Sequence, residues 1–394
     1  MKLSRAHFIV LIIQITEVLG FSLILPFLPL YARDLGATPL VVGLIPASFS
    51  LLQLFSAPIM GRLSDTYGRK PLLILSQIST LLSFIVLGFA HSLWLIFLSR
   101  AIDGLLGSNF TIAQAYLSDT STKKNRSQIF AISGVAFSIG FLIGPALGGY
   151  LSRYGYSLPA FLAAAISLVT IFLTVFFLKE TVTVKKKFKF SFSQIVDTKA
   201  VSVYFADSKL RAKLLEFFSF ISTHAIWTGT MPLFANFKFG LGADTIGFGL
   251  AYVGFINIIL RTVLFKFFIN KFGEKNMKIA GLFSVLISLI LLAVINNPWV
   301  LLLVFTFFAF GGSFVRPLLT ADISRSVSKT EQGSILGVSS SLQSISQIFG
   351  PILGGFLLTN FSPNSLGYVS AFILSFAIFL FFKSQPNPPP EWVR

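Results

Sequence analysis

The sequence predicts an all-α integral membrane protein with twelve transmembrane helices, arranged as two repeated six-helix bundles. Hydrophobic residues make up 54% of the 394 positions and charged residues only 11%, whereas a soluble domain carries roughly 25% charged residues. The apolar residues gather in runs of about 20, the length that crosses a bilayer. Motifs of the first half of the chain also recur in the second half at a nearly constant offset.

Each of the twelve apolar runs is expected to form one membrane-spanning helix. The first run is too long for a signal peptide and lacks a small-residue cleavage site, so we expect it to remain as the first span. The predicted spans lie near residues 8–31, 40–60, 71–90, 93–117, 128–151, 159–178, 214–235, 245–265, 279–296, 298–320, 334–358 and 366–382.

A long polar stretch separates the first six spans from the last six. We therefore expect an N-terminal bundle over 1–180, a cytoplasmic linker over 181–212 and a C-terminal bundle over 213–394. Residues 126–151 align with 332–357 at an offset of 206. Two parallel repeats of this kind are associated with rocking of one half against the other around a site near the bilayer midplane.

The distribution of positive charge predicts the orientation in the membrane. The net charge is +17, and 25 of the 31 Lys and Arg residues fall on one side if both termini are cytoplasmic, as the positive-inside rule requires. The basic excess then reflects topology and attraction to anionic lipid, not nucleic-acid binding. We expect a monomeric, multi-pass protein of a bacterial inner membrane with both termini in the cytoplasm.

A dense cluster of charge and glycine lies between the second and third spans, in the pattern G-x-L-x-D-x-x-G-R-K. A basic turn between two membrane-length runs must lie at a water interface, and its glycines allow close helix approach and a tight turn. A second carboxylate at the inner end of the fourth span is expected on the same face. An ordinary topology signal with capping charges is the alternative. The residues concerned are Gly61, Asp65, Gly68, Arg69, Lys70 and Asp119.

This pattern resembles the signature loop of the major facilitator superfamily of transporters. The resemblance implies that Asp65, Arg69 and Asp119 form a charge cluster that latches the cytoplasmic side in one state. In the second repeat Asn270 stands where Asp65 does and Glu274 where Arg69 does. We therefore expect any gating role of this motif to be concentrated in the first half.

The fifth span carries small residues at four-residue spacing, which form a smooth face for close helix packing, and a proline that kinks the helix. This run resembles the antiporter motif of drug:proton exporters in the same superfamily. Repeat architecture is the alternative, because Gly350, Pro351, Gly354 and Gly355 recur in the eleventh span. The residues of the motif are Gly140, Gly144, Pro145, Gly148 and Gly149.

Three ionisable residues lie within predicted spans of the first half. Glu17 is roughly 15 Å into the first span, close to the midplane, and Arg100 and Asp103 lie one turn apart in the fourth. A carboxylate removed from water favours its protonated form, so Glu17 and Asp103 are candidates for proton coupling. Drug:proton antiporters resemble this plan, with an acid in helix 1 and an Arg followed by Gly104 in helix 4. Alternatively, Asp103 simply neutralises Arg100.

Polar and aromatic residues within other spans are candidates for lining a substrate cavity, although such residues also hold helices together. A packed aromatic helix with a satisfied histidine is the alternative for His224 and Trp227. Arg261 is within snorkelling reach of the inner interface. The candidate cavity residues are Gln53, Asn109, Gln114, His224, Trp227, Asn257, Arg316, Gln343 and Gln347.

The sequence gives no sign of a cofactor or of enzymatic chemistry. It contains no Cys, no G-x-x-x-x-G-K-[ST] phosphate-binding loop, no metal-ligand cluster and no catalytic dyad. We expect no cofactor, no metal and no enzyme activity. Transport must then be driven by an ion gradient or by the gradient of the substrate itself.

The first span sharpens the functional prediction. Its acid at Glu17, the pair Gly20-Phe21 and prolines at 26 and 29 resemble the tetracycline-exporter-like branch of drug:proton antiporters. The resemblance implies a proton-coupled exporter of small amphipathic or hydrophobic compounds, with the substrate, protons and membrane lipid as its partners. That branch usually carries Asp where this chain has Glu17, which puts tetracycline itself in doubt as the substrate. An importer or facilitator of a metabolite on the same fold, or a non-transporting receptor, is the alternative.

Overall fold

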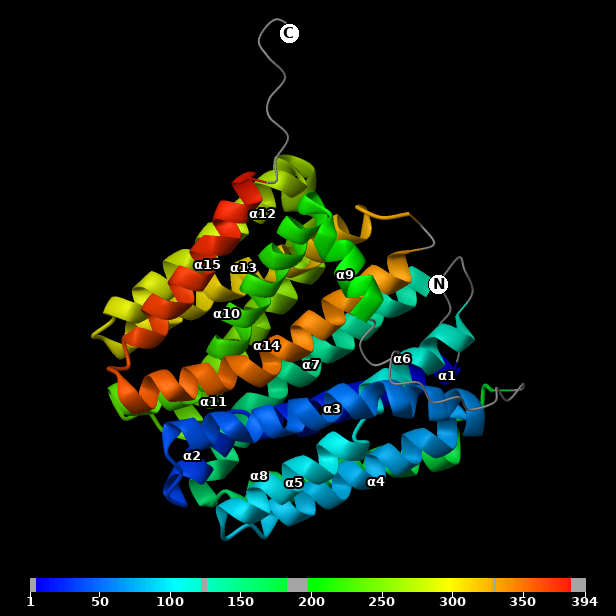
Figure 1. Ribbon diagram of the computed structural model, residues 1–394. Helices are drawn as coiled ribbons and strands as arrows, with labels where there is room; N and C mark the ends of the chain where they lie inside the picture. The colour runs from blue at the N-terminus through cyan, green and yellow to red at the C-terminus, as the bar shows by residue number, and fades with distance from the viewer. Residues whose placement is uncertain (1–4, 122–125, 183–197, 329–330, 384–394) are drawn as a thin grey trace, which may run out of the picture.

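The computed structural model describes residues 5–121, 126–182, 198–328 and 331–383, and these are almost entirely helical (Figure 1). The first half runs through α1 (Arg5–Leu23), α2 (Leu28–Asp34), α3 (Pro39–Tyr67), α4 (Arg69–Gly88), α5 (Leu93–Leu106), α6 (Asn109–Thr120), α7 (Arg126–Leu151), a short 3-10 turn (Ser152–Tyr154) and α8 (Ser157–Phe177).

The second half begins with a short helix that no apolar run predicted. Its elements are α9 (Thr198–Ala206), α10 (Ser208–Phe239), α11 (Ala243–Ile258), a π-helical turn (Ile259–Leu264), α12 (Phe265–Val294), a 3-10 turn (Pro298–Val300), α13 (Leu301–Ser324), α14 (Gln332–Asn360) and α15 (Ser365–Lys383). The predicted linker falls partly on residues 183–197, which lie outside the described part of the chain.

Nine segments of the described residues are long and apolar enough to span a membrane. One of them, Ala243–Val294, contains two crossings, because the chain turns at Gly273, whose φ of 79° suits glycine. The charged helix α10 and the interrupted pair α5 and α6 supply two more crossings. With these the helices match the twelve predicted spans, and the predicted fold class is confirmed.

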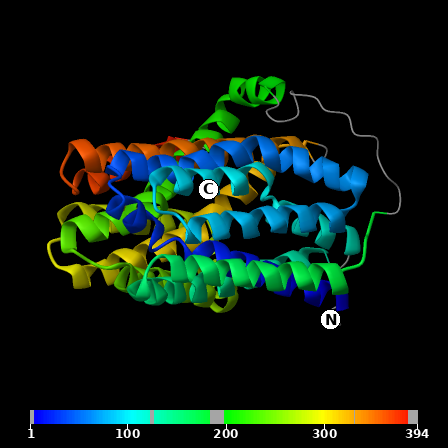
Figure 2. The same ribbon diagram turned by 90° about the horizontal axis from the view of Figure 1, so that it is seen from below.

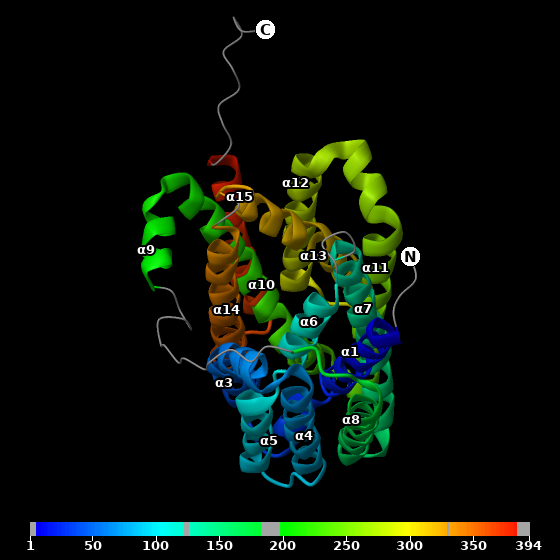
Figure 3. The same cartoon turned by 90° about the vertical axis from the view of Figure 1, so that its right-hand side faces the viewer.

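The helices pack into two groups, which we call the N bundle (α1 to α8) and the C bundle (α10 to α15). Figure 3 shows the two groups one above the other, with α9 lying to one side. Figure 2 shows the spanning helices running along one common direction, as expected for a membrane protein. Glycine allows some of the closest packing: a Cβ at Gly311 of α13 would lie 2.5 Å from the Gly281 carbonyl oxygen of α12.

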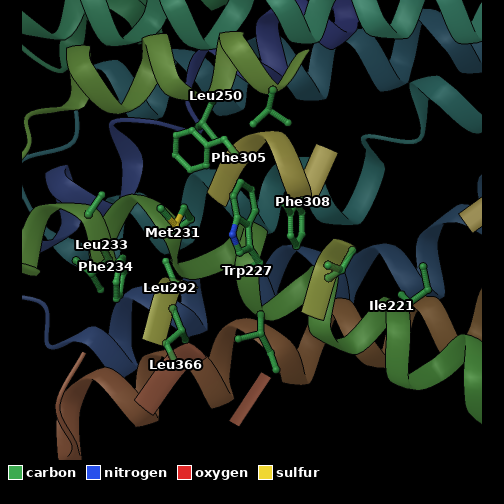
Figure 4. Packing of buried hydrophobic residues seen from close by; sticks show 14 of the residues in the cluster. Ile221, Trp227, Met231, Leu233, Phe234, Leu250, Leu292, Phe305, Phe308 and Leu366 are labelled. Atoms are coloured by element: carbon green, nitrogen blue, oxygen red, sulfur yellow. The ribbon is translucent and has the colours of Figure 1, made fainter. Parts of the chain in front are cut away.

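The C bundle is held by an aromatic core around Trp227 (Figure 4). The Trp227 ring stacks on Phe308, with ring centroids 4.0 Å apart, and meets Phe305 edge-on. Trp227 is only 3% exposed. A side chain this well packed has no surface to offer a ligand, so the packed aromatic helix is the better description of Trp227.

The two bundles meet along α3 with α14 and α7 with α11. We call the end of the molecule where α1 begins and α3 meets α4 the linker end, and the other the far end. Three hydrogen bonds join the bundles near the far end. The Leu40 N–H donates to Thr359 Oγ1 at 3.0 Å, and Arg153 Nε donates to Asp244 Oδ2 at 2.8 Å. The Arg33 guanidinium donates to the Asn236 side-chain oxygen. Figure 1 shows α3 and α14 side by side at the far end and diverging towards the linker end. The far end is therefore closed by direct contact between the bundles.

Candidate functional site

A chain of hydrogen bonds joins the two predicted proton-coupling carboxylates inside the N bundle. Asn109 Nδ2 donates to Glu17 Oε2 at 2.7 Å and to Thr80 Oγ1 at 2.9 Å, and Thr80 Oγ1 donates to Asp103 Oδ1 at 2.8 Å. We call Glu17, Thr80, Asp103 and Asn109 the acid network. Its members come from α1, α4, α5 and α6, so four helices converge on it.

A break in the fourth span places Asn109 in this network. The helix stops at Gly107, where the Gly107 N–H donates to the Asp103 carbonyl at 2.6 Å, and the Ser108 N–H donates to Ser76 Oγ at 2.7 Å. Gln53 Nε2 donates to the Gly107 carbonyl at 3.3 Å. Non-helical backbone at membrane depth is tolerated when protein groups satisfy it in this way. Gln53 thus supports the break.

Arg100 does not pair directly with Asp103 among the described residues. It donates instead to Ser83 Oγ at 3.0 Å through Nη2 and lies 5.9 Å from the centre of the Phe84 ring. Both Arg100 and Asp103 are buried, at 3% and 7% exposure. Asp103 takes its hydrogen bond from Thr80, and Arg100 and Asp103 act on each other electrostatically without a direct ion pair, so both interpretations of Asp103 stay open.

Several buried polar atoms around the acid network make no hydrogen bond within the described part of the chain. Glu17 is half-buried, and its Oε1 is one of these atoms, as are the amide nitrogen and oxygen of Gln14 and Gln77. Buried polar groups are normally paired. One carboxyl oxygen of Glu17 is therefore held by Asn109, and the other has no hydrogen-bond partner among the described residues.

The signature-loop residues come together at the linker end. Arg69 forms ion pairs with both Asp65 and Asp119, with its Nε 2.9 Å from Asp119 Oδ2. Arg69 Nη1 also donates to Ser64 Oγ at 2.6 Å. The turn needs glycine at residue 68, whose φ is 112°. We call Asp65, Arg69 and Asp119 the surface triad, since each carboxylate side chain is about one third exposed.

Glu180, which the sequence analysis did not single out, caps this loop. Its carboxylate accepts hydrogen bonds from the backbone N–H groups of Arg69 at 2.9 Å and Lys70 at 3.0 Å, the first residues of α4. Partial burial favours its neutral form, but backbone N–H donors outweigh this effect and hold the pKa of Glu180 below its ordinary value. Lys70 Nζ donates to the Val175 carbonyl at 2.7 Å. The sequence could have indicated this role, because Glu180 is an acidic residue directly after the sixth predicted span.

The glycine motif of α7 lies between α1 and α11. Ser22 Oγ of α1 donates to the Gly140 carbonyl at 3.0 Å. Side chains added at Gly144 and Gly148 would overlap α1, and one at Gly149 would overlap the start of α11. Gly247 of α11 packs in the same way against the carbonyl of Pro145. The motif therefore touches both its own bundle and the C bundle.

The remaining candidate cavity residues divide between the two bundles. Gln114 Nε2 donates to Ser133 Oγ at 2.9 Å, a helix-to-helix contact within the N bundle. In the C bundle Ser313 Oγ donates to Asn257 Oδ1 at 2.7 Å, and Gln347 is exposed. Arg316, Gln343 and His224 lie together with Arg261, as described below.

These features define a class of protein. Twelve spanning helices in two repeated bundles, with carboxyl groups buried between helices, form the architecture of a secondary transporter. The chain belongs to the major facilitator superfamily, whose family model matches residues 10–264 and 216–394. It is a transporter and not an enzyme.

Relatives cover almost the whole chain. It is 29% identical to the class H tetracycline resistance protein of Pasteurella multocida, over 90% of this chain and 89% of that protein. It is 30% identical to multidrug resistance protein 2 of Bacillus subtilis (strain 168), over the same shares. The crystal structure of the nucleoside transporter NupG matches 96% of this chain and all of that one, with a TM-score of 0.78 at 15% identity. This last likeness concerns the fold alone.

Proposed function

We propose that this protein is a proton-coupled exporter that exchanges protons for small amphipathic or hydrophobic compounds by alternating access. Its similarity to tetracycline and multidrug resistance proteins supports export of toxic organic compounds. The observation that carries the coupling is the hydrogen-bonded link from Glu17 through Asn109 and Thr80 to Asp103. The protein works as a monomer in a bacterial inner membrane, surrounded by lipid.

The linker end is the cytoplasmic end in this proposal. The excess of Lys and Arg in the loops of that end supports the orientation. With the far end closed, the conformation faces the cytoplasm and is ready to take up substrate from it. Closing the linker end would bring the surface triad against the C bundle, where it acts as the latch. The predicted bundles, 1–180 and 213–394, are the bodies that rock.

Glu17 carries the proton in this scheme. In its ionised form, the Glu17 carboxylate accepts the hydrogen bond from Asn109. A negative charge among four helices is costly in a membrane interior, and protonation of Glu17 removes that charge. Exchange follows where proton and substrate favour different states of the transporter, because each then displaces the other. Asp103 is the second carboxyl on the same path, and Arg100 sets the local field without pairing to either acid.

The test is proton-driven transport in everted membrane vesicles. Glu17→Gln should abolish accumulation driven by a pH gradient, while substrate still binds, and proton release on substrate addition should vanish in the purified variant. Glu274→Gln is the matched control, because Glu274 is an exposed carboxylate that pairs with Arg325 at 2.5 Å at the linker end. Full pH-driven transport in Glu17→Gln would move the carrier to Asp103. Accumulation of the substrate in right-side-out vesicles, and not in everted ones, would favour an importer.

A further inference from the structure

Three basic side chains come together in the C bundle, on elements that do not carry the acid network. His224 lies on α10, Arg261 in the π-helical turn and Arg316 on α13. Both arginines act electrostatically on His224, and Arg316 acts on Arg261. We call these three residues the cationic cluster. Among the described residues, its positive charge is that of the two guanidinium groups, which lie at membrane depth.

Within the described part of the chain, the two guanidinium groups are held only by neutral partners. Arg316 Nη2 donates to Gln343 Oε1 on α14 at 2.9 Å, and Arg261 Nη2 donates to the Gly312 carbonyl on α13 at 3.4 Å. An arginine has five N–H donors in a rigid fork that fits a carboxylate, sulfonate or phosphate. Most of that capacity is unused in both residues.

Every described carboxylate of the C bundle is committed elsewhere, so the cluster has no acidic counterpart within the described ranges. Two acids pair with Lys278, one with Arg325 and one with Arg153. The others accept hydrogen bonds at helix starts. The six are Asp207, Glu216, Asp244, Glu274, Asp322 and Glu331. Uncompensated charge inside a membrane is expensive and marks a functional site.

The guanidinium groups are also accessible. Arg261 and Arg316 are both exposed, although they make their contacts to other helices of the bundle. Gln343 lies on α14 and the π-helical turn continues α11, and these two helices make the main contacts with the N bundle. A guanidinium group is costly to place against lipid, so we infer that this exposed surface faces the N bundle and not the bilayer.

The local backbone is also unusual at this point. Arg261 lies in the π-helical turn that interrupts the eighth span, and such turns occur frequently at functional sites. Gly312 lies between Arg261 and His224. Its carbonyl accepts a hydrogen bond from Arg261, and a Cβ at this position would lie 4.0 Å from His224 Nε2. The π-helical turn and the missing side chain at Gly312 therefore both act on the place where Arg261 approaches His224.

We propose that the cationic cluster binds an anionic group of the exported compound, so that the substrate class is amphipathic organic anions. A carboxylate, sulfonate or phosphate would take bidentate hydrogen bonds from Arg316 and Arg261, with Gln343 and Asn257 at its edge. This inference rests on the proposed export function. It also separates the two jobs of the molecule: protons bind on the N bundle and the anion binds on the C bundle, so coupling runs through the change of conformation.

The test compares two dyes that share a xanthene ring and differ in charge. Binding to the purified full chain in detergent is measured by fluorescence anisotropy, with fluorescein as the anion and rhodamine 123 as the cation, at mildly alkaline pH. Fluorescein should bind more tightly. Arg316→Gln and Arg261→Gln should each weaken fluorescein binding by about tenfold, the usual effect of removing a charged hydrogen bond, and leave rhodamine 123 unweakened.

Two further variants keep the test sharp. Arg316→Lys keeps the charge and loses the fork, so it should retain part of the fluorescein affinity and covers the case in which Arg316→Gln does not fold. Arg211→Gln removes an exposed guanidinium at the start of α10, where it touches only the Phe205 carbonyl at 3.4 Å, and should bind fluorescein as the unaltered protein does.

Fluorescein binding no tighter than rhodamine 123 binding, including no binding of either, would overturn the anion site. An equal loss for both dyes in the two Arg→Gln variants would do the same. The proposed export function stands or falls separately, because the binding assay uses no pH gradient. Proton-driven export of cations alone would keep the exporter and refute the anionic substrate.

Discussion

The linker ends of the two bundles carry charge clusters at matching positions of the repeat, but the clusters are built differently. Asp119 in the N bundle and Asp322 in the C bundle are related by an offset of 203 residues. Asp119 pairs with Arg69, the first residue of α4. Asp322 pairs with Lys278 at 2.6 Å, and Lys278 lies beyond the turn, inside α12.

The burial of one carboxylate separates the two clusters, because the central cation is buried in both and Asp119 and Asp322 are equally exposed. The surface triad has carboxylates about one third exposed. In the C bundle Lys278 is 4% exposed and its second partner, Glu216 at 3.4 Å, is completely buried. Lys278 Nζ also lies 4.6 Å from the centre of the Phe381 ring on α15. We call Glu216, Lys278 and Asp322 the buried triad.

This difference in burial suggests different roles for the two clusters. Exposed ion pairs contribute little free energy and can break and re-form, because water replaces the lost partner. A buried pair cannot separate without leaving an unpaired charge in the interior. The surface triad has no fully buried carboxylate and therefore suits a contact that switches, whereas the fully buried Glu216 suits a permanent link from α10 to Lys278 of α12. Asn270 and Glu274 do break the loop pattern, but charge pairing at this end of the C bundle is not lost.

The largest effect on folding stability is expected for Lys278→Met. This change strands the buried Glu216 carboxylate and should cost about 3–5 kcal/mol of unfolding free energy. Denaturant unfolding of the purified protein measures it. The double variant Lys278→Met with Glu216→Gln should recover part of the loss, because it removes the unpaired charge. A loss as small as that of an exposed pair would erase the distinction between the triads.

A smaller loss is expected when the glycine contacts of the two bundles are filled. Gly148→Ala would drive a Cβ into the backbone of Leu23, which cannot move aside, at a cost of about 1–3 kcal/mol. Gly354→Ala, at the repeat position in α14, meets the Thr230 side chain at 2.5 Å, which has more room to adjust. Unfolding and transport measured on both variants should rank Gly148→Ala as the more damaged. Gly148→Leu should abolish transport yet still reach the membrane.

Asp65→Asn should change stability by no more than about 1 kcal/mol but cripple transport. Arg69 keeps Asp119 and Ser64 as partners, so the N bundle stays folded, while the latch loses one of its two carboxylates. Transport and substrate binding measured on the same preparation separate these effects. Normal transport rates in this variant would remove the latch role from the surface triad.

Sequence reasoning reached the features that are local or that repeat along the chain. The twelve apolar runs, the glycine face of α7 and the meeting of Asp65, Arg69 and Asp119 are of this kind. It missed the pairing of Glu216 with Lys278, because these residues are far apart in the chain and only the packing of both α10 and α12 against α15 brings them close. Thr80 was missed because one hydroxyl in an apolar helix looks like many others.

Arg261 shows a second limit. An arginine near the end of an apolar run has the pattern of a side chain that snorkels to the interface, and the sequence interpretation took it so. The π-helical turn places it beside Gly312 and near His224 and Arg316 instead. A π-helical turn has no signature in residue spacing, so only the three-dimensional structure reveals it.

The smallest effect is expected for Asn270→Asp, which restores the missing acid of the second loop. Asn270 is exposed, and Glu274 stands where an arginine would be needed to pair with the new carboxylate. Glu274 is itself held by Arg325 at 2.5 Å. The new acid therefore gains no cation, and stability should shift by no more than about 0.5 kcal/mol, with transport rates close to those of the unaltered protein. A transport defect like that of Asp65→Asn would mean that both loops switch, and that burial of the charge does not decide which cluster moves.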